Sequence, residues 1–443
     1  MLLIGNGTVV TRDSTNPIIK NGAVVCTQNS ISEVGNFNEL KSKYSDAELL
    51  DAKGGLIMPG LINMHHHIYS AFSRGLAIKN YDPKKFLDIL DGMWWKMDRS
   101  MNLRDVRLSA AVTLLDCIRN GVTTIFDHHA SFGAVQGSLF EISEVAKKAG
   151  LRTCLCYEVS DRDGEDKRKA SIKENLDFIK YAGENGVDMQ YGMMGMHASF
   201  TLSDRTLDEC TASLPDDTGC HVHVAESLYD AHDSLEKHGK SIVKRMQEHG
   251  VLGKKTIAVH CIHITSEDAN ILHDTGTMVV HNPESSMNNA VGAADITALS
   301  KKGILLGLGT DGYTSDMFES YRSANLLAKH STHNASAGWN EVSDMLFTGN
   351  AKMANRYFKK PLGILKPGAA ADVIVLDYHP FTKLTAENIN SHLMFGASGR
   401  CVTSTVVNGK VLMENREMKT LDEEKINADA LAQSSDFWRR INK

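Results

Sequence analysis

The 443-residue sequence lacks the features of membrane, secreted and nucleic-acid-binding proteins. No stretch approaches the roughly 18 consecutive apolar residues that a transmembrane helix needs. Only Leu2-Leu3-Ile4 lies between the initial methionine and Gly5-Asn6-Gly7, too short for the apolar region of a secretory signal. No dense run of lysine or arginine is present and the formal net charge is −6, so a basic nucleic-acid-binding surface is not indicated. We expect a protein that binds neither membranes nor nucleic acids.

Paired cysteines are also missing. The eight cysteines are scattered along the chain, and none forms a C-x-x-C motif. Scattered cysteines in a long chain are typical of small buried residues in a reducing compartment, and a chain of this length can bury a large core without disulfides. Hydrophobic residues make up 42% and charged residues 23%, close to the average for soluble proteins. The composition therefore predicts a soluble cytoplasmic protein with two or three structural units.

Short apolar runs alternate with amphipathic stretches of helical length through the middle of the chain, from about residue 56 to residue 365. Regular alternation of this kind predicts a parallel sheet, and eight strand-like runs favour a closed (β/α)₈ TIM barrel. An open, doubly wound sheet stays an alternative, because periodicity fits both folds. The eight runs are Ile57–Met64, Thr123–Phe126, Arg152–Cys156, Gln190–Met196, Gly219–Val224, Thr256–Cys261, Thr277–His281 and Ile304–Gly309.

Both ends of the chain contain short β-type runs separated by turn signals. Near the N-terminus we expect turns at Gly5-Asn6-Gly7 and Asn21-Gly22, and near the C-terminus a hairpin turn at Asn408-Gly409. The two ends share this pattern of short β-type runs and turns, which predicts that they pair in one composite β-sandwich domain. The predicted division is a β-domain of residues 1–56 and 365–418, a barrel of residues 57–364 and an exposed helical tail of residues 419–443.

Three consecutive histidines end the first predicted strand, in the segment Pro59-Gly-Leu-Ile-Asn-Met-His-His-His67. Side chains alternate between the two faces of a strand, so His65 and His67 point one way and His66 points the other. Two imidazoles on one face can bind one divalent cation together. An ordinary polar strand end is the simpler interpretation, but three histidines directly after an apolar run make it the weaker one.

Further histidines and acids end later predicted strands. His221 and His223 share a face of the fifth strand and Glu226 follows it, a combination that suits metal binding and proton transfer. His260 ends the sixth strand, and Asp311 follows the eighth. Each signal alone fits a hydrogen-bonded histidine or a turn residue. Together they gather at the C-terminal ends of the strands, where barrel enzymes place their active sites.

This order of motifs resembles the amidohydrolase superfamily, and within it the group of chlorohydrolases and deaminases of N-heterocycles. The resemblance covers nearly the whole chain and includes the segments PGLIN…HxH, GMHASFTLS, HVHVAE, HNPESS and GTDG. More narrowly, the chain resembles the SsnA group of aminohydrolases. Two departures from the commoner pattern, His66 and Glu284-Ser-Ser-Met287, leave the metal motif intact but put any specific substrate in doubt.

The resemblance implies one divalent metal ion in the site. Members of the family with two ions bridge them with a lysine at the end of the fourth strand, and residues 188–196 contain no lysine. Three imidazoles and one carboxylate suit Zn²⁺, and Fe²⁺ is the alternative because imidazole binds both. The implied ligands are His65, His67, His223 and Asp311.

The resemblance also implies the catalytic and substrate-binding residues. A divalent ion lowers the pKa of a bound water to about 7, which supplies hydroxide at neutral pH. Asp311 would accept the proton of this water, and Glu226 would protonate the departing nitrogen. His260 would orient the hydroxide or polarise the substrate. His197 and His281 match positions that usually contact the substrate.

The predicted reaction is the hydrolytic deamination of an N-heterocyclic small molecule by metal-bound hydroxide. Ring opening of a cyclic amide or ureide and dechlorination stay open as alternatives, because the same metal machinery serves all three. A catalytically silent assembly protein is less favoured, because such proteins usually lose metal ligands and here the set is complete. Relatives of this kind are commonly dimeric, so a homodimer is compatible with the sequence, although no interface can be identified.

Two other groups of residues have ambiguous roles. Trp94 and Trp95, with neighbouring methionines, form an apolar patch after the first strand. We expect core or oligomer packing there rather than a substrate lid. His128 and His129 follow the second strand, and the sequence favours a position in the pocket and a supporting role about equally.

Overall fold

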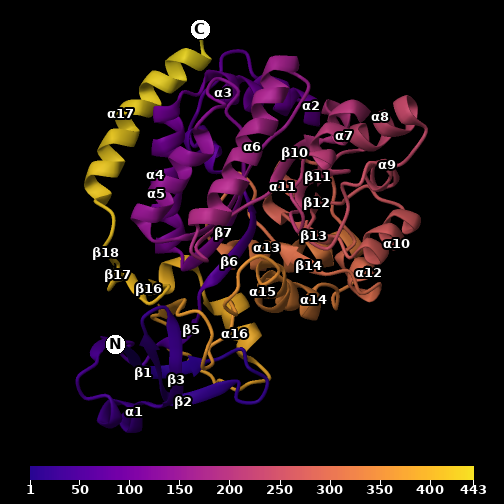
Figure 1. The fold of residues 1–443 in the computed structure, drawn as a ribbon. Helices are drawn as coiled ribbons and strands as arrows, with labels where there is room; N and C mark the ends of the chain where they lie inside the picture. Colours follow the sequence, from indigo (N-terminus) through magenta and orange to yellow (C-terminus); the bar gives the residue numbers. More distant parts are fainter.

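The computed structural model describes residues 1–443, and its main part is a barrel of parallel strands surrounded by helices (Figure 1). The strands form a four-stranded sheet in the order β6-β7-β8-β9 and a five-stranded sheet in the order β10-β11-β12-β13-β14. The barrel strands are β6 (Leu61–His66), β7 (Val122–His129), β8 (Arg152–Tyr157), β9 (Gln190–Gly192), β10 (Met194–Ala198), β11 (Cys220–Val224), β12 (Ile257–His260), β13 (Met278–His281) and β14 (Leu306–Leu308).

Isolated parallel bridges join the two sheets at both seams. Val159 pairs with Met196 at one seam, and His66 pairs with Asp311 at the other. Since β9 and β10 are consecutive pieces of one predicted strand, eight strands follow one another around the barrel in chain order. The predicted TIM-barrel fold is confirmed, and the seam between His66 and Asp311 brings two sequence motifs together.

The barrel is covered by helices that largely match the predicted amphipathic stretches. One of these stretches forms the helix Ser138–Ala149, and Gly150, with a φ of 88°, ends it. No helix combines the length and apolar character that crossing a membrane requires. The helices between the barrel strands are α2 (Phe86–Ile89), α3 (Trp95–Ser100), α4 (Leu103–Arg119), α5 (Ser138–Ala149), α6 (Glu165–Asn185), α7 (Asp204–Ala212), α8 (Leu228–His238), α9 (Ile242–Glu248), α10 (Ser266–Thr275), α11 (Pro283–Asn288) and α12 (Ile296–Lys301), and those after β14 are α13 (Met317–Thr332), α14 (Trp339–Ser343) and α15 (Asn350–Ala354).

Strands from both ends of the chain pair in a second, nine-stranded sheet below the barrel in Figure 1. The connection between the two ends is the antiparallel pairing of β5 with β15, in which Ile374 lies opposite Met58. The division into domains at the stated residues stays a prediction. This sheet contains β1 (Leu2–Val10), β2 (Ile18–Thr27), β3 (Ser30–Asn36), β4 (Glu48–Asp51), β5 (Leu56–Pro59), β15 (Val373–Leu376), β16 (Val402–Val407), β17 (Lys410–Glu414) and β18 (Glu417–Met418), and the helices beside it are α1 (Phe37–Lys43) and α16 (Ile389–Gly396).

The predicted turns near the N-terminus are wrong. Gly5-Asn6-Gly7 lies inside the continuous strand β1, and the irregularity appears as register shifts against β2 rather than as a chain reversal. The predicted first barrel strand is instead divided in two at Gly60. A side chain at Gly60 would place its Cβ 2.2 Å from the side chain of Thr123, so the chain can cross from the terminal sheet into the barrel only with glycine there.

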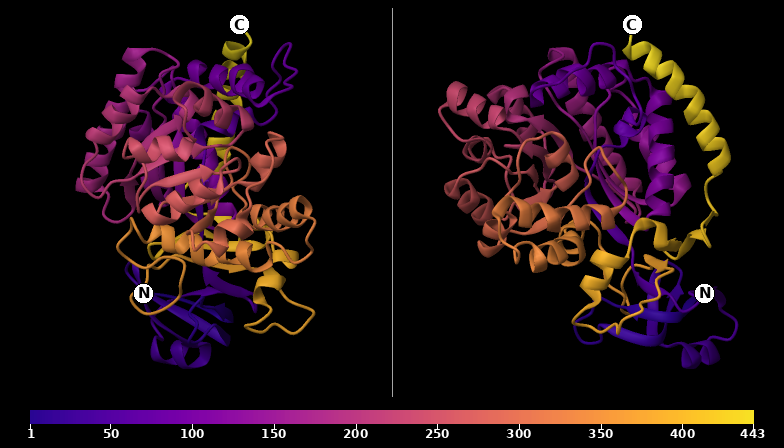
Figure 2. Two further views of the ribbon diagram at one scale, coloured as in Figure 1. Left: turned by 90° about the vertical axis from the view of Figure 1, so that its right-hand side faces the viewer. Right: turned by 180° about the vertical axis from the view of Figure 1, so that it is seen from behind.

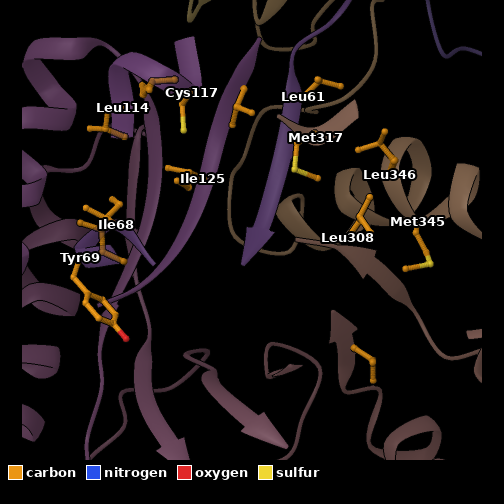
Figure 3. Close-up of a cluster of buried hydrophobic side chains, with 14 of the residues drawn as sticks. Leu61, Ile68, Tyr69, Leu114, Cys117, Ile125, Leu308, Met317, Met345 and Leu346 are labelled. Carbon is orange, nitrogen blue, oxygen red and sulfur yellow. The ribbon is translucent and has the colours of Figure 1, made fainter. Parts of the chain in front are cut away.

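The hydrophobic core fills the space between barrel strands and outer helices. Figure 3 shows Leu114 and Cys117 of α4 near Ile125 of β7, with Leu61 of β6 on the adjacent strand. All four of these side chains are buried. Burial of such side chains contributes about 1.5–3 kcal/mol each, so packing holds the strands whose ends carry the polar residues.

The C-terminal helix α17 (Glu423–Ile441) exists as predicted but is not simply exposed. Figures 1 and 2 show it running along the outside of the barrel beside α4. Phe437 is fully buried, and Arg440 forms an ion pair with the buried Asp105 of α4. The helix was predicted from the sequence, but its packing against α4 was not. The expectation of an exposed tail is therefore corrected.

Candidate active site

Polar side chains from four strand ends converge at one rim of the barrel. His65 lies in β6 and His67 directly after it, His223 lies in β11, His260 ends β12, and Asp311 follows β14. His260 and Asp311 have φ values of 71° and 54°, in the left-handed region that residues with side chains rarely adopt. Such conformations persist only where the surroundings hold them, and they gather at functional sites.

The ligand-type atoms of these residues form two overlapping groups. Within each group, the atoms all lie within 4.8 Å of one another. Asp311 connects the groups, because its Oδ1 lies 3.4 Å from His67 Nε2 and its Oδ2 lies 3.5 Å from His260 Nε2. The two groups are His65, His67 and His223, and His65, His260 and Asp311.

Hydrogen bonds on the far side of the imidazole rings orient the ligand nitrogens. His67 Nδ1 donates to the carbonyl oxygen of His128 at 2.6 Å, and His223 Nδ1 donates to that of His197 at 2.8 Å. A carbonyl only accepts, so both Nδ1 atoms carry hydrogen and both Nε2 atoms keep a lone pair. His65 Nδ1 contacts His221 Nε2 at 2.9 Å, which leaves His65 Nε2 free as well.

These nitrogens fit a divalent metal ion. The Nε2 atom of His65 is buried and has no hydrogen-bond partner, a costly state that a bound cation would relieve. Burial, followed by the neighbouring imidazoles, holds the pKa of His65 well below its usual value, so it is neutral and able to coordinate. Burial pushes the pKa of Asp311 upward, but His67, His260 and His223 outweigh it, and the pKa is lowered.

Glu226 lies beside this group without belonging to it. Its Oε2 is 3.5 Å from His260 Nε2, and its Oε1 accepts a hydrogen bond from Asn289 Nδ2 at 3.1 Å. Burial, with a further contribution from Asp311, raises the pKa of Glu226 well above its usual value. A carboxyl group in this environment can hold and release a proton.

Comparison with known proteins identifies the fold and the family. The model of the amidohydrolase family matches residues 56–412. The chain belongs to the amidohydrolase family. It is 31% identical to a 5'-deoxyadenosine deaminase from Methanosarcina barkeri, with 100% of this chain and 99% of the relative aligned. Membership confirms the predicted enzyme class, hydrolases of carbon–nitrogen bonds other than peptide bonds.

Solved structures of the amidohydrolase fold agree with this assignment. An adenosine deaminase from Xanthomonas campestris with bound zinc superposes with a TM-score of 0.86 at 22% identity, covering 99% of this chain and 98% of the other. A zinc complex of atrazine chlorohydrolase from Arthrobacter aurescens superposes with a TM-score of 0.82 at 22% identity, covering 98% and 100%. At this level of identity the likeness concerns the fold.

The remaining histidines named from the sequence lie in different positions relative to the site. His197 lines a cavity beside the five rim residues described above, His65, His67, His223, His260 and Asp311, which we call the metal-type residues. Its Nδ1 contacts Thr201 Oγ1 at 2.7 Å. His281 is buried but does not line this cavity, so its contact with substrate stays a prediction. His66 lines a different cavity, as strand alternation predicts. His128 has the supporting position, with its ring 4.6 Å from that of His223.

The same cavity gives the tryptophans a position that the sequence did not favour. Trp94 and Trp95 both line it, together with Tyr69 and Phe200. The Trp95 ring lies 6.2 Å from that of His197, and the Trp94 ring lies 6.0 Å from that of Tyr69. Trp94 also packs against the hydrophobic core, as expected, so the two tryptophans line the cavity in addition to the packing role of Trp94. These residues belong to the long connection between β6 and α4, whose path the sequence pattern does not reveal.

A buried ionic cluster beside the cavity was also missed. Arg162 forms ion pairs with Asp98, Glu158 and Asp163. Burial raises the pKa of Asp98 to about 7 and that of Glu158 to about 8, although Arg162 opposes both shifts. Glu158 directly follows β8, so the rule that directed attention to other strand ends would have found it. No comparable signal marks Asp98.

Proposed function

We propose that this chain is a metal-dependent amidohydrolase that deaminates an N-heterocyclic small molecule related to adenosine. The observation that carries the proposal is the convergence of free imidazole nitrogens and Asp311 on one rim of the barrel, with Glu226 beside them. The full-length relative from Methanosarcina barkeri is a 5'-deoxyadenosine deaminase, which supports deamination of an amino-substituted ring over the other reactions of the family.

The proposed metal ligands are His65, His67, His223 and Asp311. The ion, when bound, would lower the pKa of water and so supply hydroxide at neutral pH. Zinc fits the nitrogen-rich donor set, and it is bound in both structural neighbours. One ion is proposed, because neither β9 nor β10 contains a lysine that could bridge two.

Residues of the chain then have complementary tasks. Asp311 takes the proton from the attacking water at a carboxylate oxygen, and Glu226 Oε2 delivers a proton to the departing amine. Asn289 holds the Glu226 carboxyl group through Oε1, which keeps Oε2 directed to the reaction. His260 Nε2 has no hydrogen-bond partner, and it stabilises the negative charge that develops on the atoms bonded to the attacked carbon. Glu226 would contribute about 10²–10⁴-fold in rate.

Ammonia release tests the proposal. Purified zinc-loaded protein should release ammonia from 5'-deoxyadenosine or another amino-substituted purine, and Glu226→Gln should reduce kcat by at least about 10²-fold with metal retained. Glu236→Gln, on the exposed side of α8, is the matched control and should change nothing. A ring-opened carboxylate or released chloride from other heterocycles would assign the alternative reactions. Native protein without stoichiometric metal would contradict the site.

A further inference from the structure

The cavity beside the proposed metal ligands combines aromatic walls with an excess of carboxylates. It is lined by five aromatic side chains and five carboxylates, and by no lysine or arginine. Glu226 and Asp311 serve the proposed reaction. That leaves Asp98, Glu158 and Asp230 facing the cavity without a role in bond cleavage. A cavity of this composition favours one sign of substrate charge.

One oxygen of Glu158 lacks a hydrogen-bond donor. The side chain is 4% exposed and its Oε1 accepts from Arg162 Nη2 at 3.4 Å. The Oε2 atom lies 3.7 Å from His128 Nδ1, but His128 Nε2 donates to the carbonyl oxygen of Met196 at 3.1 Å. Neutral His128 therefore carries its hydrogen on Nε2 and has none to offer Glu158. Glu158 lines the cavity, so this oxygen is available to accept a hydrogen bond from a bound group.

Arg162 cannot recognise a negatively charged group on the substrate. Its guanidinium donates to both oxygens of Asp98 as well as to Glu158. Its faces are covered by Trp95, at 5.2 Å from the ring centroid, and by Phe132, at 4.1 Å. The carboxylates around it, which include Asp163, outnumber it three to one. A substrate carboxylate here would meet acidic side chains and no free cation.

Aromatic rings and an unpaired carboxylate together recognise cations, because a ring face attracts positive charge and a carboxylate accepts its N–H groups. We propose that the heterocyclic substrate carries a positively charged amino substituent whose N–H donates to Glu158 Oε2 in this aromatic-walled cavity. The inference rests on the proposed function and narrows its substrate class. Glu158 then determines specificity, whereas the metal-side residues perform the reaction.

Three nucleosides that differ only at the 5' position test the inference. They are 5'-amino-5'-deoxyadenosine, which is cationic, 5'-deoxyadenosine, which is neutral, and adenosine-5'-carboxylic acid, which is anionic. We expect kcat/KM, measured by ammonia release with the zinc-loaded enzyme, to be at least tenfold higher for the amine than for the neutral compound. The anionic compound should be at least tenfold worse than the neutral one.

A cationic group bound at Glu158 would favour its charged form against the effect of burial on its pKa. The preference should therefore disappear when Glu158 cannot become charged. In Glu158→Gln the ratio of kcat/KM between amine and neutral compound should fall to within about twofold of one, and this ratio cancels any general loss of activity. Glu174→Gln, which removes a carboxyl group that caps α5 and does not line the cavity, should keep the wild-type ratio. Equal or reversed preference in the wild-type enzyme would overturn the inference even if the variant failed to fold.

Binding separates failure of this inference from failure of the proposed function. Calorimetric titration of zinc-loaded Glu226→Gln protein with the three nucleosides reports recognition without turnover. Tighter binding of the amine without ammonia release by the wild-type enzyme would refute deamination and retain the cation site. Ammonia release without cation preference would refute only the inference. Absence of binding by all three nucleosides would overturn it as well.

Discussion

Asn350 should hold the barrel closed at the seam beside the metal-type residues. Its Nδ2 donates to the carbonyl oxygens of Ile62 in β6 and Leu308 in β14, at 2.7 and 2.9 Å, and its Oδ1 accepts from the Leu308 amide at 2.7 Å. The side chain is fully buried. Gly307 leaves the space it occupies, since a Cβ there would approach Asn350 Oδ1 to 2.7 Å.

Replacement of Asn350 by alanine would leave three buried backbone groups without these partners. At about 1 kcal/mol for each unpaired group, which is the lower end of the usual range, the loss of stability is about 3 kcal/mol. Urea unfolding followed by circular dichroism measures it, and Asn185→Ala, on the exposed end of α6, is the control, with an expected change below about 0.5 kcal/mol.

The same variant should weaken metal binding, because His65 lies three residues after Ile62 on the strand that Asn350 anchors. Metal content after dialysis would show whether the loosened seam lets that strand move away from β14. A loss of stability below about 1 kcal/mol, with metal content unchanged, would refute the idea that this one side chain replaces the missing ladder hydrogen bonds.

Three other predictions concern the terminal helix, the metal site and pH. Arg440→Ala should lower the free energy of unfolding by about 2 kcal/mol or more, because it leaves the buried Asp105 without its cation. Arg439 is exposed and pairs only within α17, so Arg439→Ala should change this free energy little. Unfolding curves compare the two variants. His66→Ala should retain stoichiometric metal while His65→Ala and His67→Ala lose it, as measured by elemental analysis, because His66 lies outside the metal group. Burial raises the pKa of Glu284 to about 7, so the folded state binds its proton more tightly, and this contribution to stability falls as pH rises from about 4.5 through 7. The melting temperature of Glu284→Gln should therefore be higher than that of wild type at pH 8.5 but not at pH 4. Equal shifts at both pH values would contradict the assignment.

Strand periodicity predicted the barrel well, because buried parallel strands appear in the sequence as short apolar runs. It also placed His65, His67, His223, His260 and Asp311 correctly at one rim, since alternation and strand direction determine where each side chain points. The division at Gly60 was missed for a physical reason. The apolar pattern continues across it, and only the approach of Thr123 from another strand shows that the chain changes sheet there.

The residues on the substrate side of the cavity could not be placed from strand periodicity. Trp94, Trp95 and Asp98 lie on the connection between β6 and α4, where no periodicity fixes the direction of a side chain. Their position depends on contacts with residues distant in sequence, such as the ion pair of Asp98 with Arg162. Pairings of this kind leave no pattern in a single sequence, so composition suggested only an apolar patch.

The two sides of the site are also held by different parts of the molecule. The metal-type residues sit on strands joined by the barrel's own hydrogen bonds, whereas the connection that carries the tryptophans is clamped from outside by α17. Trp438 Nε1 donates to the Phe72 carbonyl oxygen at 2.7 Å, and the Phe437 ring packs 5.9 Å from that of Phe72. Arg440 also bonds to the carbonyl oxygen of Ser100 at the other end of this connection. Because the reacting groups do not depend on this clamp, changes in α17 and the connection can alter which substrate fits while the hydrolytic residues stay in place.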